Sequence, residues 1–135
     1  MNQRVEAPNS EDINHIARQL LHASDLVEEV SGAGLSGDLS DLAMLQNVLD
    51  KKVIEREATY SLQALGMAFG KVFVNNNEGY DWWMVEDEYG RDPAVRYRDT
   101  SLLVFPQTMI SKRVEDGEDV TVVELYEGLK NQLQR

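Results

Sequence analysis

Residues 81–98 read DWWMVEDEYGRDPAVRYR, and this stretch decides the fold class. Asp81–Val85 and Ala94–Arg98 are short segments rich in aromatic and β-branched residues, which is typical of strands. Turn-forming residues around Glu88–Gly90 separate the two segments. Because strands joined by so short a connection pair as antiparallel neighbours, the stretch predicts a β-hairpin.

Further strands are expected on both sides of this hairpin. Lys71–Val74 precedes it across the turn Asn75–Gly79, and Leu102–Phe105 follows it across Asp99 and Thr100. Both segments are rich in residues that favour strands. Four short strands with short connections predict a four-stranded antiparallel meander.

Helical spacing surrounds the strands. Apolar residues recur three, four or seven positions apart before and after them, which predicts three helices ahead of the meander and two behind it. The fold class is therefore α+β, with N-terminal helices, the meander and two C-terminal helices. We expect residues 1–9 to be a flexible lead-in and residues 10–135 to form a single α+β domain. The expected helices run from the Ser10 N-cap to the Gly32 C-cap, over about 39–49 and 54–69, from Pro106 to Gly117, and from about Thr121 onward.

The glycines of the first half indicate packing rather than a cofactor site. Gly32–Gly37 matches GxGxxG, but the dinucleotide-binding fingerprint requires a strand before its first glycine, and a helix is expected there. We interpret this segment as a flexible helix-to-helix connection, and we predict no cofactor. Gly66 is expected to let another backbone approach closely, and Gly70 is expected to cap the helix that precedes it.

The charge balance excludes several classes of protein. The chain of 135 residues carries 24 acidic and 13 basic side chains, a net charge of −11. This charge argues against a protein that binds nucleic acid by phosphate neutralisation, or that lies on anionic lipid. Because cysteine is absent, disulfides, thiol nucleophiles and cysteine metal sites are excluded. No apolar run exceeds four residues and the first ten residues are polar, so we expect no membrane span, no secretory signal and a cytoplasmic location.

Few residues suit catalysis or metal binding. His15 and His22 both point away from the apolar stripe of the first helix, so we interpret them as solvated surface residues. Acidic turns could hold calcium or magnesium through oxygen ligands, but neither acidic turn matches the calcium-loop pattern, and we predict no metal. The acidic groups are Glu86, Asp87 and Glu88 in the hairpin and Asp116, Glu118 and Asp119 near the C-terminus.

Trp82 and Trp83 are adjacent on one predicted strand, so their rings point to opposite faces of the sheet. One ring is expected in the core. The other either lies under a helix or contacts a partner, and the sequence does not distinguish which ring has which role.

The arginines of the second half are expected to form ion pairs. Arg96 and Arg98 share one face of a predicted strand and could bridge to Glu86 or Glu88 on the neighbouring strand. The alternative is an anion or carboxylate clamp built from two of the arginines, with Arg91 and Arg113 as further candidates.

Arg113 supports a more specific prediction. It follows Met109 and Ile110 by four and three residues, which places it near the inward face of its helix. A bidentate contact from Arg113 to Asp87, Glu88 or Asp92 would join helix to sheet. The alternative is that Arg113 points into a pocket and binds the anion of a ligand.

Three segments of the second half are Leu65–Gly70, Val85–Ala94 and Val104–Glu115. The most specific motifs within them are DEYGRDPA and FPQTMISKR. These segments resemble a bacterial family known as domain of unknown function 3806, over about Leu62 to Leu129. The resemblance implies the fold. Because that family has no established activity, the resemblance implies no catalytic residue.

Size, acidity and the lack of a nucleophile–base set predict a small acidic non-catalytic bacterial binding module. One version is an immunity- or antitoxin-type protein that covers the basic surface of a toxin, so the expected partner is a protein of opposite charge. One alternative is a metal-dependent enzyme that uses Asp87, Glu88 or Asp92 of the acidic hairpin turn, and another is mimicry of DNA by rows of carboxylates. The oligomeric state stays open. The candidate contact residues are Trp82, Trp83, Asp87, Glu88, Arg91, Asp92, Arg96, Arg98 and Arg113.

Overall fold

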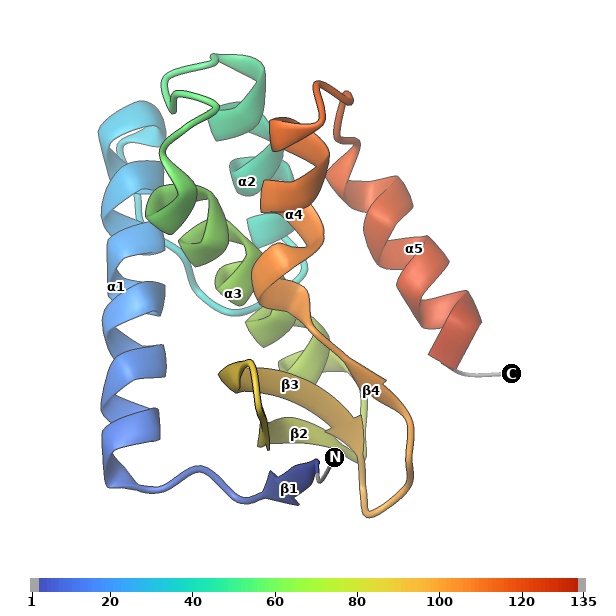
Figure 1. Cartoon of the computed structure of the whole chain (residues 1–135). Helices are drawn as coiled ribbons and strands as arrows, with labels where there is room; N and C mark the ends of the chain where they lie inside the picture. The colour runs from blue at the N-terminus through green and yellow to red at the C-terminus, as the bar shows by residue number, and fades with distance from the viewer. Residues whose placement is uncertain (1–2, 134–135) are drawn as a thin grey trace.

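The computed structural model describes residues 3–133, which form five α-helices and a four-stranded antiparallel sheet. The predicted α+β class, with helices before and after the hairpin, is confirmed. Figure 1 shows the sheet at one end of the molecule, beneath the helices. In chain order the elements are β1 (Arg4–Glu6), α1 (Ser10–Ser31), α2 (Asp41–Asp50), α3 (Thr59–Asn76), β2 (Tyr80–Asp87), β3 (Gly90–Tyr97), β4 (Leu103–Val104), α4 (Pro106–Glu115) and α5 (Val122–Leu133).

The hairpin predicted from residues 81–98 is confirmed. β2 and β3 pair antiparallel from Tyr80 opposite Tyr97 to Asp87 opposite Gly90, and two residues form the turn between them. β4 pairs with β3 on the far side, within the segment predicted as the last strand. The sheet order is β1-β2-β3-β4.

The outer strand beside β2 differs from the prediction. Lys71–Val74 is helical and belongs to α3, because Val72 and Phe73 extend the buried surface of that helix and are fully buried there. β1 takes the outer place, with Val5 opposite Val85. The prediction of a flexible lead-in is therefore wrong for Arg4–Glu6.

α1 begins with a capping box centred one residue before the predicted cap. The Asn9 side chain, and not that of Ser10, accepts a hydrogen bond from the backbone N–H of Asp12 at 2.9 Å. The Asp12 carboxylate accepts in turn from the backbone N–H of Asn9 at 2.9 Å. Gly32 ends the helix in the left-handed region, with φ of 81°, as predicted. Since α1 precedes it, Gly32–Gly37 is a helix-to-helix connection that lacks the strand of the dinucleotide fingerprint.

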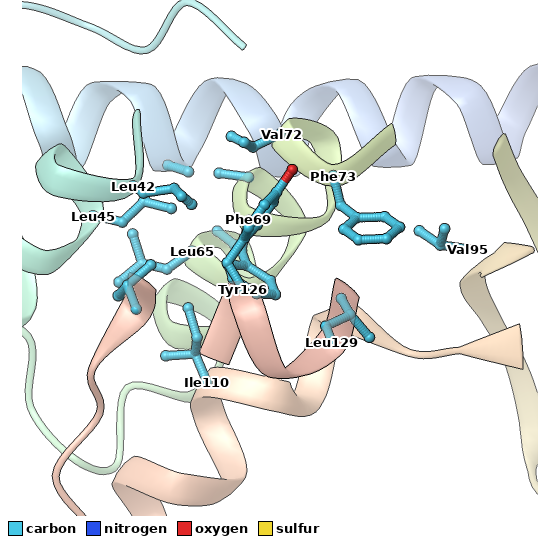
Figure 2. Close-up of a cluster of buried hydrophobic side chains, with 14 of the residues drawn as sticks. Leu42, Leu45, Leu65, Phe69, Val72, Phe73, Val95, Ile110, Tyr126 and Leu129 are labelled. Carbon is cyan, nitrogen blue, oxygen red and sulfur yellow. The ribbon is translucent and has the colours of Figure 1, made fainter. Parts of the chain in front are cut away.

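α3 is the central helix of the hydrophobic core. Leu65, Phe69 and Phe73 of α3 are fully buried. The ring of Tyr126 on α5 packs edge-on against the rings of Phe69 and Phe73, at centroid distances of 6.0 and 5.6 Å (Figure 2). α3 is buried on most sides. No helix within residues 3–133 is long and apolar enough to cross a membrane.

Gly66 and Gly70 place the start of α4 directly against α3. A Cβ at Gly66 would collide with the backbone oxygen of Pro106, so the predicted close backbone approach is confirmed. Gly70 lies inside α3 and is not the predicted cap; a Cβ there would lie 2.7 Å from the Trp82 ring and 2.8 Å from the Pro106 side chain. Pro106 occupies the first turn of α4, as predicted. This packing fixes where α4 begins relative to α3.

Candidate binding cavity

A cavity of about 350 Å³ lies where the β2–β3 hairpin meets the start of α4. Two of the motif segments found in the sequence form most of its lining, and Gln3 and Gln63 complete it. We call it the hairpin–α4 cavity. The hairpin contributes Val85, Asp87, Asp92 and Pro93. The start of α4 contributes Phe105, Gln107, Thr108 and Lys112.

Two carboxylates share one wall of this cavity. Asp92 lies directly opposite Val85 in the β2–β3 register, and Asp87 follows Val85 by two residues, so both aspartates point to the same face of the sheet. Diagonal positions of this kind are about 7–8 Å apart, within reach of each other's charge. Neither aspartate forms an ion pair within residues 3–133. This wall is therefore negatively charged and unneutralised.

The facing wall comes from the first two turns of α4. Gln107 Oε1 is buried and has no hydrogen-bond partner within residues 3–133. Phe105, just before the helix, is 38% exposed, an unusual degree for a phenylalanine. Lys112 is exposed at the rim, and it forms no ion pair with either aspartate. The cavity thus combines acceptors, an aromatic ring and a single cation.

A protein-family profile matches residues 41–126, and its description is Domain of unknown function (DUF3806). The chain belongs to this family. The match begins earlier in the chain than the resemblance found in the sequence, and of the cavity lining only Gln3 lies outside it. No curated protein matches the sequence significantly.

One solved structure shares the fold of this DUF3806 chain. It is a crystal structure from Bacteroides thetaiotaomicron VPI-5482, with a TM-score of 0.90 and 18% sequence identity. The match covers 98% of the present chain and 48% of the other, so the chain spans about half the length of that protein. At this identity the likeness shows the fold alone.

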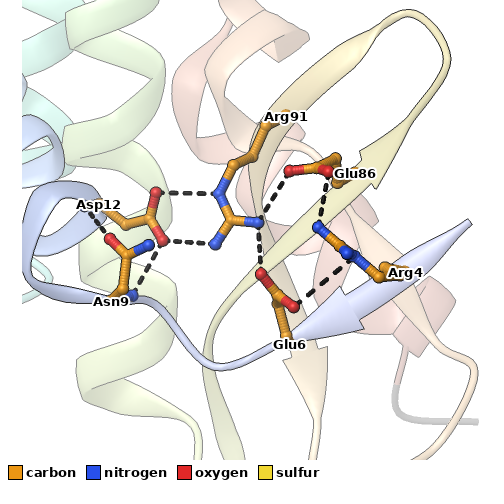
Figure 3. Close-up of polar contacts among 6 residues, drawn as sticks. All are labelled: Arg4, Glu6, Asn9, Asp12, Glu86 and Arg91. Atoms are coloured by element: carbon orange, nitrogen blue, oxygen red, sulfur yellow. Dashed lines mark hydrogen bonds and ion pairs between the residues drawn. The ribbon is translucent and has the colours of Figure 1, made fainter.

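Arg91 lies on the opposite face of the hairpin, away from the cavity. Its guanidinium donates to both carboxylate oxygens of Asp12 at 3.1 and 2.6 Å, to Glu6 at 2.5 Å and to Glu86 at 3.2 Å (Figure 3). Arg4 donates to Glu86 at 2.6 Å. We call these five residues the Arg91 cluster. Hydrogen bonds from Arg91 hold the pKa of Asp12 below its ordinary value.

The Arg91 cluster has a structural role, because it ties β1 and the first turn of α1 to the hairpin. The sequence pattern points to Arg91 and Glu86 but not to their partners Arg4, Glu6 and Asp12. One signal was present: Asp12 lies three residues after Asn9, the spacing of a capping box, which fixes its carboxylate near the start of α1.

The two tryptophans separate as the strand geometry predicts. Trp82 packs towards the helices, beside Gly70 and the buried residues Met67 and Met84, so it is the core ring. Trp83 lies on the other face, where the Arg96 guanidinium covers it at 4.6 Å from the ring centroid.

The predicted bridges from Arg96 and Arg98 to acidic residues of β2 are wrong. Arg96 donates to the backbone oxygens of Thr100 and Asp99 at 2.6 and 2.8 Å, because the β3–β4 turn folds back over it. Arg98 lies past the end of β3 with φ of 49°, and its guanidinium lies over the Tyr97 ring at 5.3 Å. Neither arginine forms an ion pair within the described residues.

The predicted bridge from Arg113 to the hairpin is also wrong. Its Nη1 donates to the backbone oxygen of Met109 at 2.8 Å, so the side chain folds back along its own helix. The basic residue of α4 that lines the cavity with Asp87 and Asp92 is Lys112, one position earlier. Glu88 is exposed in the turn and does not line the cavity.

The histidines do not form a catalytic set. His15 is exposed. His22 is half-buried rather than fully solvated, with Nε2 at 2.9 Å from Ser61 Oγ and its ring beside Tyr60. A serine–histidine contact alone is insufficient, since no acidic group within residues 3–133 orients the other ring nitrogen. Neither His22 nor Ser61 lines the cavities described here.

A larger cavity of about 570 Å³ lies between the α2–α3 and α4–α5 connections. It includes Glu118 and Asp119 of the second acidic turn together with Lys52 and Arg56, and none of the candidate contact residues lines it. Across residues 3–133, no group of three or more histidine and acidic side chains is arranged to hold a metal ion.

Proposed function

We propose that this chain is a non-catalytic binding module whose partner is a protein of opposite charge. An immunity- or antitoxin-type protein of bacteria, which covers the basic surface of a toxin, is one version of this function. The supporting observation is that few acidic side chains are neutralised. Within residues 3–133, ion pairs involve three carboxylates, those of Glu6, Asp12 and Glu86. The remaining acidic residues form no ion pair within the described part of the chain, whose net charge over all 135 residues is −11.

Unneutralised surface charge of one sign has a physical consequence. It accelerates the encounter with a partner of the opposite sign and disfavours partners of the same sign. It also opposes folding through self-repulsion, so the fold tolerates a cost that a binding function would explain.

The enzymatic alternative has less support. It places a divalent ion at Asp87, Glu88 or Asp92, and of these Glu88 lies outside the hairpin–α4 cavity. That leaves two carboxylates at the site, with no histidine beside them. A binding role uses the same two carboxylates without further ligands.

The test is recovery of a partner from the native host at low and high salt. We expect a basic protein, whose association rate falls as salt screens the attraction. A variant that replaces two exposed carboxylates, Glu118→Gln with Asp119→Asn, should bind the partner more slowly. Its melting temperature should equal that of the wild type, which separates an effect of charge from loss of the fold. Recovery of no protein, or of a partner whose binding is insensitive to salt, would contradict the proposal. Divalent-dependent turnover that Asp87→Asn and Asp92→Asn abolish would support the enzyme instead.

A further inference from the structure

The hairpin–α4 cavity contains two carboxylates with acceptor sites left over for a ligand. Asp92 makes no ion pair within residues 3–133, and Asp87 accepts a hydrogen bond from the backbone N–H of Tyr89 at 2.8 Å. Each carboxylate has two oxygens and therefore several acceptor sites, so the pair favours a ligand with several N–H donors.

The charge of the lining selects a single positive charge. Asp87 and Asp92 contribute two negative charges and Lys112 one positive charge, which leaves a net charge of −1. A monocation placed between the aspartates would relieve their mutual repulsion and neutralise the cavity. The volume of about 350 Å³ lies at the lower end of the range for small-ligand sites, so it suits one side chain rather than a folded segment.

We infer that the hairpin–α4 cavity binds an arginine side chain of the partner protein. This inference rests on the proposed function and adds to it a place and a residue type. Arginine has five N–H donors in a planar fork, enough to reach Asp87 and Asp92 together. The partly exposed ring of Phe105 offers the guanidinium an aromatic face. A lysine ammonium has three donors at one point and stacks less well.

An anionic ligand fits the cavity less well. The N-terminus of α4 is a weak anion site, because Pro106 has no N–H and the N–H of Thr108 already donates to the backbone oxygen of Phe105 at 3.3 Å. Lys112 is the one basic residue among the lining residues, and both aspartates would repel an anion.

The same hairpin already holds one guanidinium between carboxylates. On its other face, Arg91 donates hydrogen bonds of 2.5 to 3.2 Å to the carboxylates of Asp12, Glu6 and Glu86 (Figure 3). Trp83 holds a second guanidinium by its ring face. Both contacts that the inference requires, carboxylate and aromatic, therefore occur elsewhere on β2 and β3.

The experiment titrates the full chain with the blocked peptide acetyl-Gly-Arg-Gly-amide and follows the backbone amides by NMR. The expected shifts centre on the two cavity aspartates and Gln107. Peptides with lysine and with citrulline, the neutral analogue of arginine, are the ligand controls. The arginine peptide should bind most tightly and the citrulline peptide should not bind, because citrulline lacks the charge.

Three variants sharpen the titration. Asp92→Asn should weaken binding of the arginine peptide about tenfold, by removing a charge-assisted contact. Glu88→Gln, which removes a neighbouring carboxylate outside the cavity, should leave binding unchanged. Lys112→Gln should strengthen binding about threefold, because a competing cation is removed. Melting temperatures confirm that each variant folds.

The outcomes separate this inference from the proposed function. If a basic partner is recovered but Asp92→Asn binds it as tightly as the wild type, the cavity inference fails and the proposed function stands. If the arginine peptide binds the cavity but no basic partner exists, the proposed function fails. Equal binding of the citrulline peptide, or shifts at these residues with Mg²⁺ and none with the arginine peptide, would overturn the arginine site.

Discussion

The two faces of the β2–β3 hairpin hold acidic residues in opposite states. On the face towards α1, Glu86 is paired with Arg4 and Arg91. On the other face, Asp87 and Asp92 have no ion-pair partner within residues 3–133. One step along a strand moves a side chain from one face to the other, so adjacent carboxylates serve different ends. The paired face joins elements of the fold, and the two carboxylates of the other face form no ion pair within residues 3–133.

Replacement of Arg91 by alanine should give the largest effect. Three carboxylates lose their shared partner, and the Asp12 side chain is only 10% exposed, so water compensates it poorly. The melting temperature should fall by roughly 5–10 °C, with partial recovery in Arg91→Lys because the fork is lost. Arg18→Ala, an exposed arginine of α1 without an ion pair in the described residues, is the control. Equal melting temperatures for Arg91→Ala and Arg18→Ala would show that the ion pairs of Arg91 do not stabilise the fold.

Acid should weaken the paired face next. The pKa of Asp12 is lower in the folded chain than its ordinary 3.8, chiefly through hydrogen bonds from Arg91. Such a carboxyl stabilises the fold above its unfolded pKa, and that contribution disappears as the pH falls through the folded value. Urea midpoints of the wild type should therefore decline below about pH 4, and those of Arg91→Gln should decline less. Identical pH profiles would show that the pair contributes nothing.

Arg113→Ala should have a smaller effect. The side chain gives one hydrogen bond to Met109 of its own helix, so its loss should cost less than about 1 kcal/mol in denaturant unfolding. Arg113→Lys should behave like the alanine variant within error. A loss as large as that of Arg91→Ala would mean that Arg113 reaches a carboxylate in solution.

Asp92→Asn should change stability least. Asp92 has no ion pair within residues 3–133, and removal of its charge relieves repulsion from Asp87. The free energy of unfolding should stay within about 0.5 kcal/mol of the wild type, on the stabilising side. Chemical denaturation measures it. A marked destabilisation would place Asp92 among the residues that hold the fold.

Local chemistry was sufficient to predict some elements and insufficient for others. The hairpin and the start of α4 depend on a turn and on Pro106, whose preferences act within a few residues. Lys71–Val74 is predicted as a strand because its residues favour strands. Since α3 is buried on most sides, its last turns show no amphipathic stripe that would indicate a helix, and no stop signal precedes them. β1 has three residues and depends on the free edge of β2, which local sequence does not reveal.

The candidate site was predictable only from its strand side. Asp87 and Asp92 follow from the register of a hairpin, and both line the cavity. On α4 the choice between Lys112 and Arg113 depends on the exact rotation of the helix against α3. That rotation is fixed by the close contact of Gly66 with Pro106, a tertiary contact that no local pattern shows.

The place of β1 in the sheet also orders the assembly of the chain in time. Arg4 and its partner Glu86 are 82 positions apart in sequence. During synthesis, β1 therefore leaves the ribosome long before there is an edge for it to join. Closing so long a loop is entropically unfavourable until the hairpin exists to reward it. β1 thus has to wait for the hairpin, and until it joins the sheet the edge of β2 stays open to pairing with another strand.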